Sequence, residues 1–213
     1  MFVGERMSRP VITLTPDMPI HDALELFKKE HIRRAPVVKD GKLVGIVSEK
    51  DLLNASPSPA TTLSIWEMHY LLSKITVSAV MTRNVITVTE DTPIEEAARI
   101  MADNKIGGLP VMRDGQVVGI ITETDLFKIF LELMGARKKG LRATVLVEDK
   151  PGQLARITKA VADLGGNFVA FGQFSGEDVS TSLITFKVQG VNGDQLKKAL
   201  SECCKEVWDI RET

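Results

Sequence analysis

The sequence predicts a mixed α and β protein (α+β, or α/β), in which two β-α-β-β-α units pack as a pair and a βαββαβ domain follows. Three observations predict this class. One stretch of the chain occurs twice, apolar residues recur at helical spacing after short strands, and longer alternating strands begin after a short basic segment. The expected divisions are a first repeat with an inserted helix at 1–73, a second repeat at 74–135, a linker at 136–140 and a last domain at 141–213.

The repeated stretch is Gly45–Leu52 (GIVSEKDL), which returns as Gly119–Leu126 (GIITETDL), an offset of 119 − 45 = 74 residues. Shifting Met7–Leu53 by this offset lays it on Met81–Phe127 without a gap, and roughly 21 of about 47 positions are identical. Self-similarity of this kind indicates two copies of one supersecondary unit.

Each copy has the same predicted elements. A short strand is expected at Val11–Leu14, and the helix after it carries apolar residues at i, i+3, i+4 and i+7. These residues are Ile20, Ala23, Leu24 and Phe27 in the first copy, and Ile94, Ala97, Ala98 and Met101 in the second. The dipeptides Asp40-Gly41 and Asp114-Gly115 favour tight turns between the next two strands. Because one such unit cannot cover both faces of its small sheet, we expect the pair to be the domain.

The segment between the copies is turn-rich at Ser56–Thr62 and then shows helical periodicity at Ile65, Met68, Leu72 and Ile75. This predicted helix either packs on its own domain or forms a dimer surface.

The last part of the chain predicts a ferredoxin-like βαββαβ order. Strands are expected at 141–148, 168–174, 182–188 and 207–210, with one helix whose buried face is Leu154, Ile157, Val161 and Leu164 and another marked by Leu196, Leu200 and Cys203. Gly165-Gly166-Asn167 supplies residues that tolerate the positive φ found at helix ends.

Composition excludes several classes of function. With 27 basic and 28 acidic residues and a formal charge of −1, the chain has no basic surplus for a nucleic-acid partner. No apolar run approaches the ~20 residues of a spanning helix and the first residues lack a signal-peptide pattern, so we expect a cytoplasmic protein with no membrane partner. Cys203 and Cys204 fit reduced thiols, and His21, His31 and His69 have no metal spacing. We expect neither a metal site nor a catalytic cofactor, and no enzyme.

The chemistry of the repeated stretch suggests a ligand site. Each copy reads as an apolar strand, a glycine, a hydroxyl residue, two polar residues and an aspartate at a helix start, where unpaired backbone N–H groups favour a phosphate. The aspartate can accept two hydrogen bonds from a vicinal diol such as a ribose. The spacing Ser48-x-x-Asp51 also fits a capping box, and the two roles can coexist.

With Ala35-Pro36-Val37-Val38 and Leu109-Pro110-Val111-Met112 before them, these motifs resemble a tandem pair of CBS domains. In that family the hydroxyl residue and the aspartate bind the phosphate and ribose of adenosine-type ligands in clefts between the repeats. The resemblance implies two nucleotide half-sites, Thr13, Ala35, Pro36, Gly45, Ser48 and Asp51, and Thr87, Leu109, Pro110, Gly119, Thr122 and Asp125. Arg33, Arg34, Lys50 and Lys105 either neutralise phosphates or are solvated surface residues.

The turns Asp149-x-Pro151-Gly152-x-Leu154 and Gly165-Gly166-Asn167 resemble an ACT domain, a module that dimerises and often binds an amino acid. The resemblance implies amino-acid binding by Asp149, Gly152, Gln153, Leu154 and Asn167, with dimerisation alone as the alternative. A CBS pair followed by one ACT domain most resembles the acetoin-utilisation B protein family.

These resemblances imply a non-catalytic sensor. Its effector would be an adenosine-type ligand such as AMP, ADP, ATP, NAD or S-adenosylmethionine. The protein would form a homodimer through its CBS or ACT domains and report ligand state to a metabolic enzyme, with acetoin utilisation as the candidate process. A ligand-independent interaction scaffold and a regulatory subunit of a metabolic enzyme are the alternatives.

Overall fold

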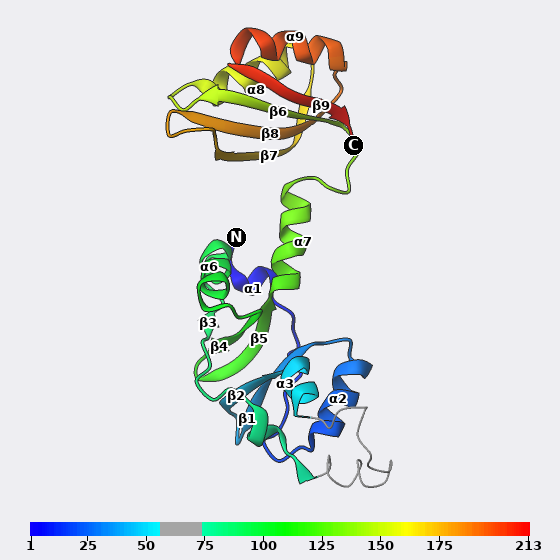
Figure 1. The fold of residues 1–213 in the computed structure, drawn as a ribbon, viewed down its shortest axis with the longest axis vertical. Coiled ribbons are helices and arrows are strands. Elements are labelled where there is room, and N and C mark those ends of the chain that lie inside the picture. The colour runs from blue at the N-terminus through cyan, green and yellow to red at the C-terminus, as the bar shows by residue number, and fades with distance from the viewer. Residues whose placement is uncertain (56–73) are drawn as a thin grey trace. The chain divides into compact units, whose positions relative to one another are not determined.

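A computed structural model describes residues 1–55 and 74–213, and the chain divides into two compact units, Met1–Leu126 and Phe127–Thr213 (Figure 1). The helix predicted from Ile65, Met68 and Leu72 lies outside the described residues.

The first unit contains both copies of the repeat. The first copy comprises α1 (Val3–Arg6), α2 (Ile20–Lys29), β1 (Arg34–Lys39), β2 (Lys42–Ser48) and α3 (Glu49–Asn54). The second comprises α5 (Val77–Val80), β3 (Val88–Thr89), α6 (Ile94–Asn104), β4 (Gly108–Arg113), β5 (Gln116–Thr122) and the start of α7 (Glu123–Leu133). The strand predicted at Val11–Leu14 is a single bridge from Leu14 to Val37.

The two hairpins form as the turn residues predict. β1 pairs with β2 and β4 with β5, both antiparallel, and Asp40-Gly41 and Asp114-Gly115 adopt positive φ at both central residues. Each hairpin therefore ends with its hydroxyl residue, Ser48 or Thr122, at the start of a helix.

The leading segment of each copy packs on the other copy. Val3 N donates to Thr92 O (2.9 Å) in the second copy, and Val77 N donates to Met18 O (2.9 Å) in the first. Val77 and Met81 complete the core formed by α2, β1, β2 and α3 of the first copy. The pair is therefore the folding unit, as the repeat analysis predicts.

The second unit is a four-stranded antiparallel sheet with α8 and α9 on one face (Figure 1). Its elements are β6 (Leu141–Glu148), α8 (Gln153–Asp163), β7 (Asn167–Ser175), β8 (Thr181–Gln189), α9 (Gly193–Cys203) and β9 (Glu206–Glu212), and the strand order is β7-β8-β6-β9. This confirms the βαββαβ prediction.

The buried face of α8 begins one residue earlier than the sequence predicts. Gly152, with φ 92°, precedes a helix whose inward line is Gln153, Ile157 and Val161. Leu154 lies about 100° around the helix from Gln153, and it is 41% exposed. Its predicted burial is therefore wrong.

The opposite face of this sheet holds a buried lysine. Lys187 on β8 is 5% exposed, and its Nζ donates to Gly135 O (3.0 Å) and Lys138 O (2.9 Å). Gly135, with φ 58°, lies two residues after the end of α7. Lys187 thus fastens the segment that follows α7 to the sheet.

Across residues 1–55 and 74–213, we find no helix with the length and apolar character needed to span a membrane.

Candidate ligand-binding cleft

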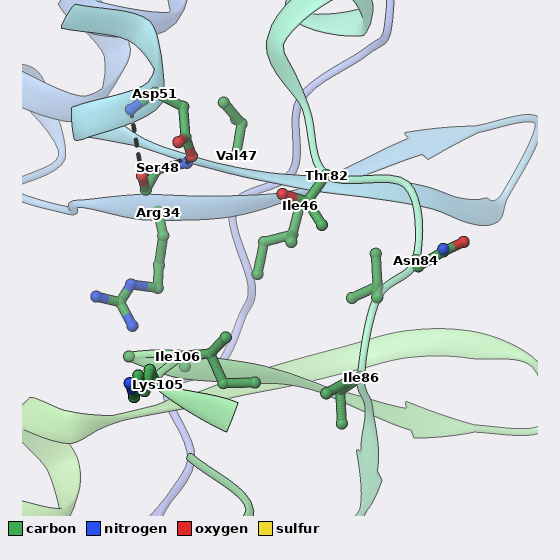
Figure 2. Close-up of a pocket in the computed structure, with 13 residues that line it drawn as sticks. Arg34, Ile46, Val47, Ser48, Asp51, Thr82, Asn84, Ile86, Lys105 and Ile106 are labelled. Atoms are coloured by element: carbon green, nitrogen blue, oxygen red, sulfur yellow. Dashed lines mark hydrogen bonds between the residues drawn. The ribbon is translucent and has the colours of Figure 1, made fainter. Parts of the chain in front are cut away.

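A cavity of about 320 Å³ lies in the first unit, between segments that come from both copies (Figure 2). Three stretches of chain line it: the β1–β2 hairpin with the start of α3, the segment before β3, and the turn from α6 into β4. The lining residues are Arg34, Ile46, Val47, Ser48, Asp51, Thr82, Asn84, Val85, Ile86, Lys105, Ile106, Gly107 and Gly108.

Ser48 and Asp51 form a reciprocal cap at the start of α3. The Asp51 Oδ2 atom accepts from Ser48 N (2.8 Å) and Ser48 Oγ (2.6 Å), and Asp51 N donates to Ser48 Oγ (3.3 Å). This confirms the capping interpretation. Every hydrogen bond found for the carboxylate among the described residues uses Oδ2. Asp51 lines the cavity and its Oδ1 makes neither of these bonds, so the cap leaves one carboxylate oxygen unused by Ser48.

The remaining walls combine apolar surface with a few polar groups. Ile46, Val85, Ile86 and Ile106 supply the apolar part, and Figure 2 shows Ile46, Ile86 and Ile106 around one part of the space. Binding cavities for small organic ligands are mostly apolar with a few convergent polar groups. The lining is suited to a flat apolar base joined to a polar sugar.

Arg34 extends from β1 toward Lys105 and Ile106 (Figure 2). Its side chain is 20% exposed and Nη1 is buried without a hydrogen-bond partner, whereas Nη2 lies 4.0 Å from the Glu123 Oε2 atom. Burial lowers the pKa of Arg34 below its ordinary value, while the Glu123 carboxylate acts in the opposite direction. The guanidinium stays charged near neutral pH, because arginine is effectively always protonated in proteins.

The second copy of the motif has the same local geometry. The Asp125 Oδ2 atom accepts from Thr122 N (3.0 Å) and Thr122 Oγ1 (2.7 Å), and Asp125 is 7% exposed. Arg33 Nη2 donates to Thr124 Oγ1 (3.0 Å), so a residue from the first copy reaches this motif.

The structure separates the other predicted nucleotide contacts from the cavity. Of the first half-site, Ser48 and Asp51 line it, while Thr13 is exposed and Ala35 and Pro36 are buried in the fold. Gly45 packs against Met81, where a Cβ atom would collide with the thioether.

The second half-site shows the same separation. Gly119 packs in the same way on Met7, Leu109 and Pro110 are buried, and Thr87 is exposed.

Sequence reasoning missed the wall formed by Thr82, Asn84–Ile86 and Gly107–Gly108. One signal for it was present in the repeat. Met7 and Met81 are equivalent positions, 74 residues apart. The residue after each methionine pairs with the hairpin of the other copy, Ser8 with Ile120 and Thr82 with Ile46.

The residues of the second unit that are predicted to bind an amino acid do not all lie close together. Asp149 follows β6, and Gly152, Gln153 and Leu154 begin α8 at the same end of the sheet. Asn167 begins β7 opposite Gln189, whereas the end of β6 lies opposite Thr181. The two ends of β8 are separated by roughly 25 Å at about 3.3 Å per residue. Within one chain Asn167 therefore does not join the other four.

Gln153 and the two cysteines are the notable polar groups near α8 and α9. Gln153 is 7% exposed, and its Oε1 atom has no hydrogen-bond partner. Cys203 Sγ and Cys204 Sγ are free thiols 3.7 Å apart. The pKa of the Cys204 thiol is raised to about 12, mainly by burial and to a smaller extent by the neighbouring Cys203 thiol. Within the described part of the chain, no group of three or more metal-binding side chains occurs.

Comparisons with known proteins match both units. The model of the CBS domain matches residues 3–58 and 77–132, and the model of the ACT domain matches residues 142–205. The CBS domain pair of protein MJ0100, solved with 5′-methylthioadenosine and S-adenosyl-L-methionine, is 34% identical with a TM-score of 0.52, covering 65% of this chain and 98% of that one.

Two further solved structures are similar. A Vibrio cholerae protein assigned to acetoin utilization (AcuB) is 32% identical with a TM-score of 0.53, over 65% of this chain and 96% of that one. Arabidopsis thaliana CBSX2, solved with AMP, is 30% identical with a TM-score of 0.52, over 62% of this chain and 97% of that one.

Proposed function

Because this chain belongs to the CBS-domain family, as a tandem pair of CBS domains followed by an ACT domain, we propose that it is a non-catalytic regulatory protein with an adenosine-type effector. The effector binds in the cleft beside Ser48 and Asp51. AMP, ADP, ATP, NAD and S-adenosylmethionine are the candidates.

The observation that carries this proposal is the cleft itself. Its volume of about 320 Å³ lies within the ~300–1,000 Å³ of small-molecule sites. It combines an apolar wall with the Asp51 carboxylate, whose Oδ1 can accept from a ribose diol. Two similar CBS pairs are solved with adenosine compounds, which supports the same ligand class here.

We base the first half-site on Ser48 and Asp51, and the second on Thr122 and Asp125. The other predicted nucleotide contacts remain predictions for a ligand-bound arrangement. They are Thr13, Ala35, Pro36 and Gly45 in the first copy, and Thr87, Leu109, Pro110 and Gly119 in the second. A ligand that binds one arrangement of the two repeats better than another shifts their equilibrium by its differential affinity. The segment 136–140 then leads to the ACT domain.

For the ACT domain, we propose an amino acid near Asp149, Gly152, Gln153 and Leu154. The unpartnered Gln153 Oε1 supports this, since it is an acceptor for an ammonium group. Asn167 can contribute only from a second chain, which would fit a homodimer.

Exposed apolar residues on α7 favour a second function, that of an interaction scaffold. Phe127 is 66% exposed, Phe130 50% and Leu133 59%. These residues are candidates for a homodimer surface or for a metabolic enzyme target, including one in acetoin utilisation.

A thermal-denaturation panel tests the effector. The purified protein is heated alone and with each adenosine compound, with GMP as the control for the base. Ligand at ~100 times its Kd stabilises the native state by about 2.7 kcal/mol, which is a clear rise in Tm. The proposal fails if no adenosine compound raises the Tm, and the scaffold function is then favoured.

A further inference from the structure

The two cysteines of the chain are neighbours at the end of α9. Successive residues of an α-helix point about 100° apart, so their side chains do not normally face each other. Here α9 ends at Cys203, and Cys204 is extended, with φ −112° and ψ 159°. With this change in the backbone, the two Sγ atoms lie 3.7 Å apart, and both are free thiols.

The backbone on both sides holds this pair in place. Cys204 N donates to Leu200 O (2.9 Å) in α9, and Lys205 N donates to Leu146 O (3.0 Å) on β6. Both cysteines pack against the hydrophobic core of the second unit and remain partly exposed. The dithiol is therefore preorganised and within reach of a small molecule.

The protonation state of the pair limits its chemistry. Burial, and to a smaller extent the Cys203 thiol, raises the pKa of Cys204 to about 12, so this thiol is protonated near neutral pH. Alkylation and disulfide exchange require a thiolate, so both are slow at Cys204. A disulfide within the pair is also disfavoured, because adjacent Cα atoms are about 3.8 Å apart and disulfides usually join Cα atoms about 4.4–6.8 Å apart.

The surroundings also disfavour a divalent metal ion. Zn²⁺ in structural sites takes four protein ligands, and among the residues that the structure describes no group of three or more candidate ligands occurs. The positive charge of Arg156 on α8 acts on Cys204, and it repels a cation. A neutral compound that needs only two thiols meets neither obstacle.

We propose that Cys203 and Cys204 form a binding site for neutral trivalent arsenic compounds, arsenous acid or an organic arsenoxide. In water such a compound is R–As(OH)₂, where R is a hydroxyl or an organic group. Two As–O bonds and two S–H bonds break, two As–S bonds form, and two water molecules leave. The arsenic stays trivalent, so no oxidant or reductant is needed. This inference is independent of the proposed effector.

Titration of the full chain with phenylarsine oxide tests the site, because the sequence contains only these two cysteines. The reduced protein is kept under nitrogen, and intact mass spectrometry is combined with a count of the remaining thiols. One equivalent should add one arsenic atom to each chain and remove both thiols. An excess of 2-mercaptoethanol should leave the adduct in place, whereas dithiothreitol, which is itself a dithiol, should remove it.

Cys203→Ser and Cys204→Ser are the matched variants. Each keeps one thiol and should bind the arsenical at least about 100-fold more weakly, because the second As–S bond of the wild type forms within one molecule. In urea, wild-type affinity should fall several-fold, since the backbone no longer holds the pair together. The comparison of the two competing thiols uses the wild type, so the test does not depend on the folding of a variant.

Three results would overturn the inference and leave the effector proposal standing. They are two arsenic atoms bound to each chain, an adduct that 2-mercaptoethanol removes, and a serine variant that binds as tightly as the wild type. Zn²⁺ alone should protect neither thiol from the thiol reagent. Protection of both thiols by Zn²⁺ would show a metal site and would contradict the choice of trivalent arsenic.

Discussion

Substitution of Asp51 separates the capping role of this residue from the ligand role that we propose for it. In the structure Oδ2 accepts from Ser48 N (2.8 Å) and Ser48 Oγ (2.6 Å) at the start of α3. Asp51 is the N3 residue of the capping box, and the N-cap is Ser48. A hydrogen bond contributes a net of about 0.5–1.5 kcal/mol to stability. For Asp51→Ala we therefore expect a loss of about 1 kcal/mol, which is a fall of roughly 3–5 °C in the Tm of a unit of this size.

The ligand response gives the second readout. A bound effector at ~100 times its Kd adds about 2.7 kcal/mol to the wild type, and Asp51→Ala should remove most of this gain. Asp51→Asn keeps one acceptor oxygen for Ser48 N and loses a negative charge from the first turn of α3, so its stability should fall by about 0.3–1 kcal/mol. Its ligand response should still fall, because a neutral amide offers one acceptor oxygen where the carboxylate offers two.

Differential scanning calorimetry with and without ligand is the assay, since it separates the transitions of the two units. Thr92→Ala is the matched control. It removes the hydrogen bond from Thr89 N to Thr92 Oγ1 (3.1 Å) in the same unit, away from the cleft. It should lower the Tm and keep the full ligand response. If Asp51→Ala behaves like Thr92→Ala, the aspartate serves only as a cap and the ligand reasoning is refuted.

Three further predictions follow from single contacts. Gly107→Ala should fold, since the three atoms nearest its Cβ are at the flexible ends of Arg34 and Glu123, but displacement of Arg34, which lines the cleft, should weaken AMP binding several-fold in titration calorimetry. Lys187→Met should destabilise the second unit by about 1–3 kcal/mol in urea denaturation, because Gly135 O and Lys138 O lose their donor. The pKa of Cys204, raised by burial to about 12, makes the second unit lose stability as pH rises from about 9 toward 12.

Each of these has its own control. Lys197→Met removes an exposed lysine of α9 and should leave the urea midpoint unchanged, and an equal effect of both lysine variants would contradict the role of Lys187. The folded state favours the neutral form of the Cys204 thiol. Its contribution to the free energy of unfolding is therefore fully present below the pKa of this thiol in the unfolded chain, and it is lost as the pH rises above that value. Cys204→Ala should reduce the difference in urea midpoint between about pH 8 and about pH 10.5. An unchanged difference would show that other groups cause it.

Most of the fold was predictable because its signals are local. Asp40-Gly41 and Asp114-Gly115 specify turns whose two central residues have positive φ, and the structure shows φ of 51° and 76° at the first pair. The helical stripes of α2 and α6 follow the 3.6-residue period. The inward line of α8 begins at Gln153, a polar residue that an apolar pattern does not find, and the neighbouring Leu154 is exposed.

The cleft was only half predictable because its two walls are far apart in the chain. Ser48 and Asp51 belong to one short motif and were found by it. Thr82 and Gly107 reach the same cavity from the other repeat, and apart from the recurrence of Met7 as Met81 beside Thr82, no pattern in the sequence marks them. The motif predicts Gly45 as a ligand contact, and in the structure its lack of a side chain leaves room for Met81. Long-range packing decides such positions, and a single sequence does not show it.

The exchange of leading segments explains why a ligand here can influence the whole pair. The segment Thr82–Ile86 follows α5, which packs on the first copy, and then enters β3 of the second. The cleft is lined by this segment, by the first hairpin at Ser48 and by the second copy at Gly107, so the proposed effector would touch all three. Its contacts therefore depend on how the two copies are placed, and any change in that placement alters the binding free energy. By linkage, binding of the proposed effector would alter the placement by the same free energy, so such a response would originate in the pair and a single repeat could not produce it.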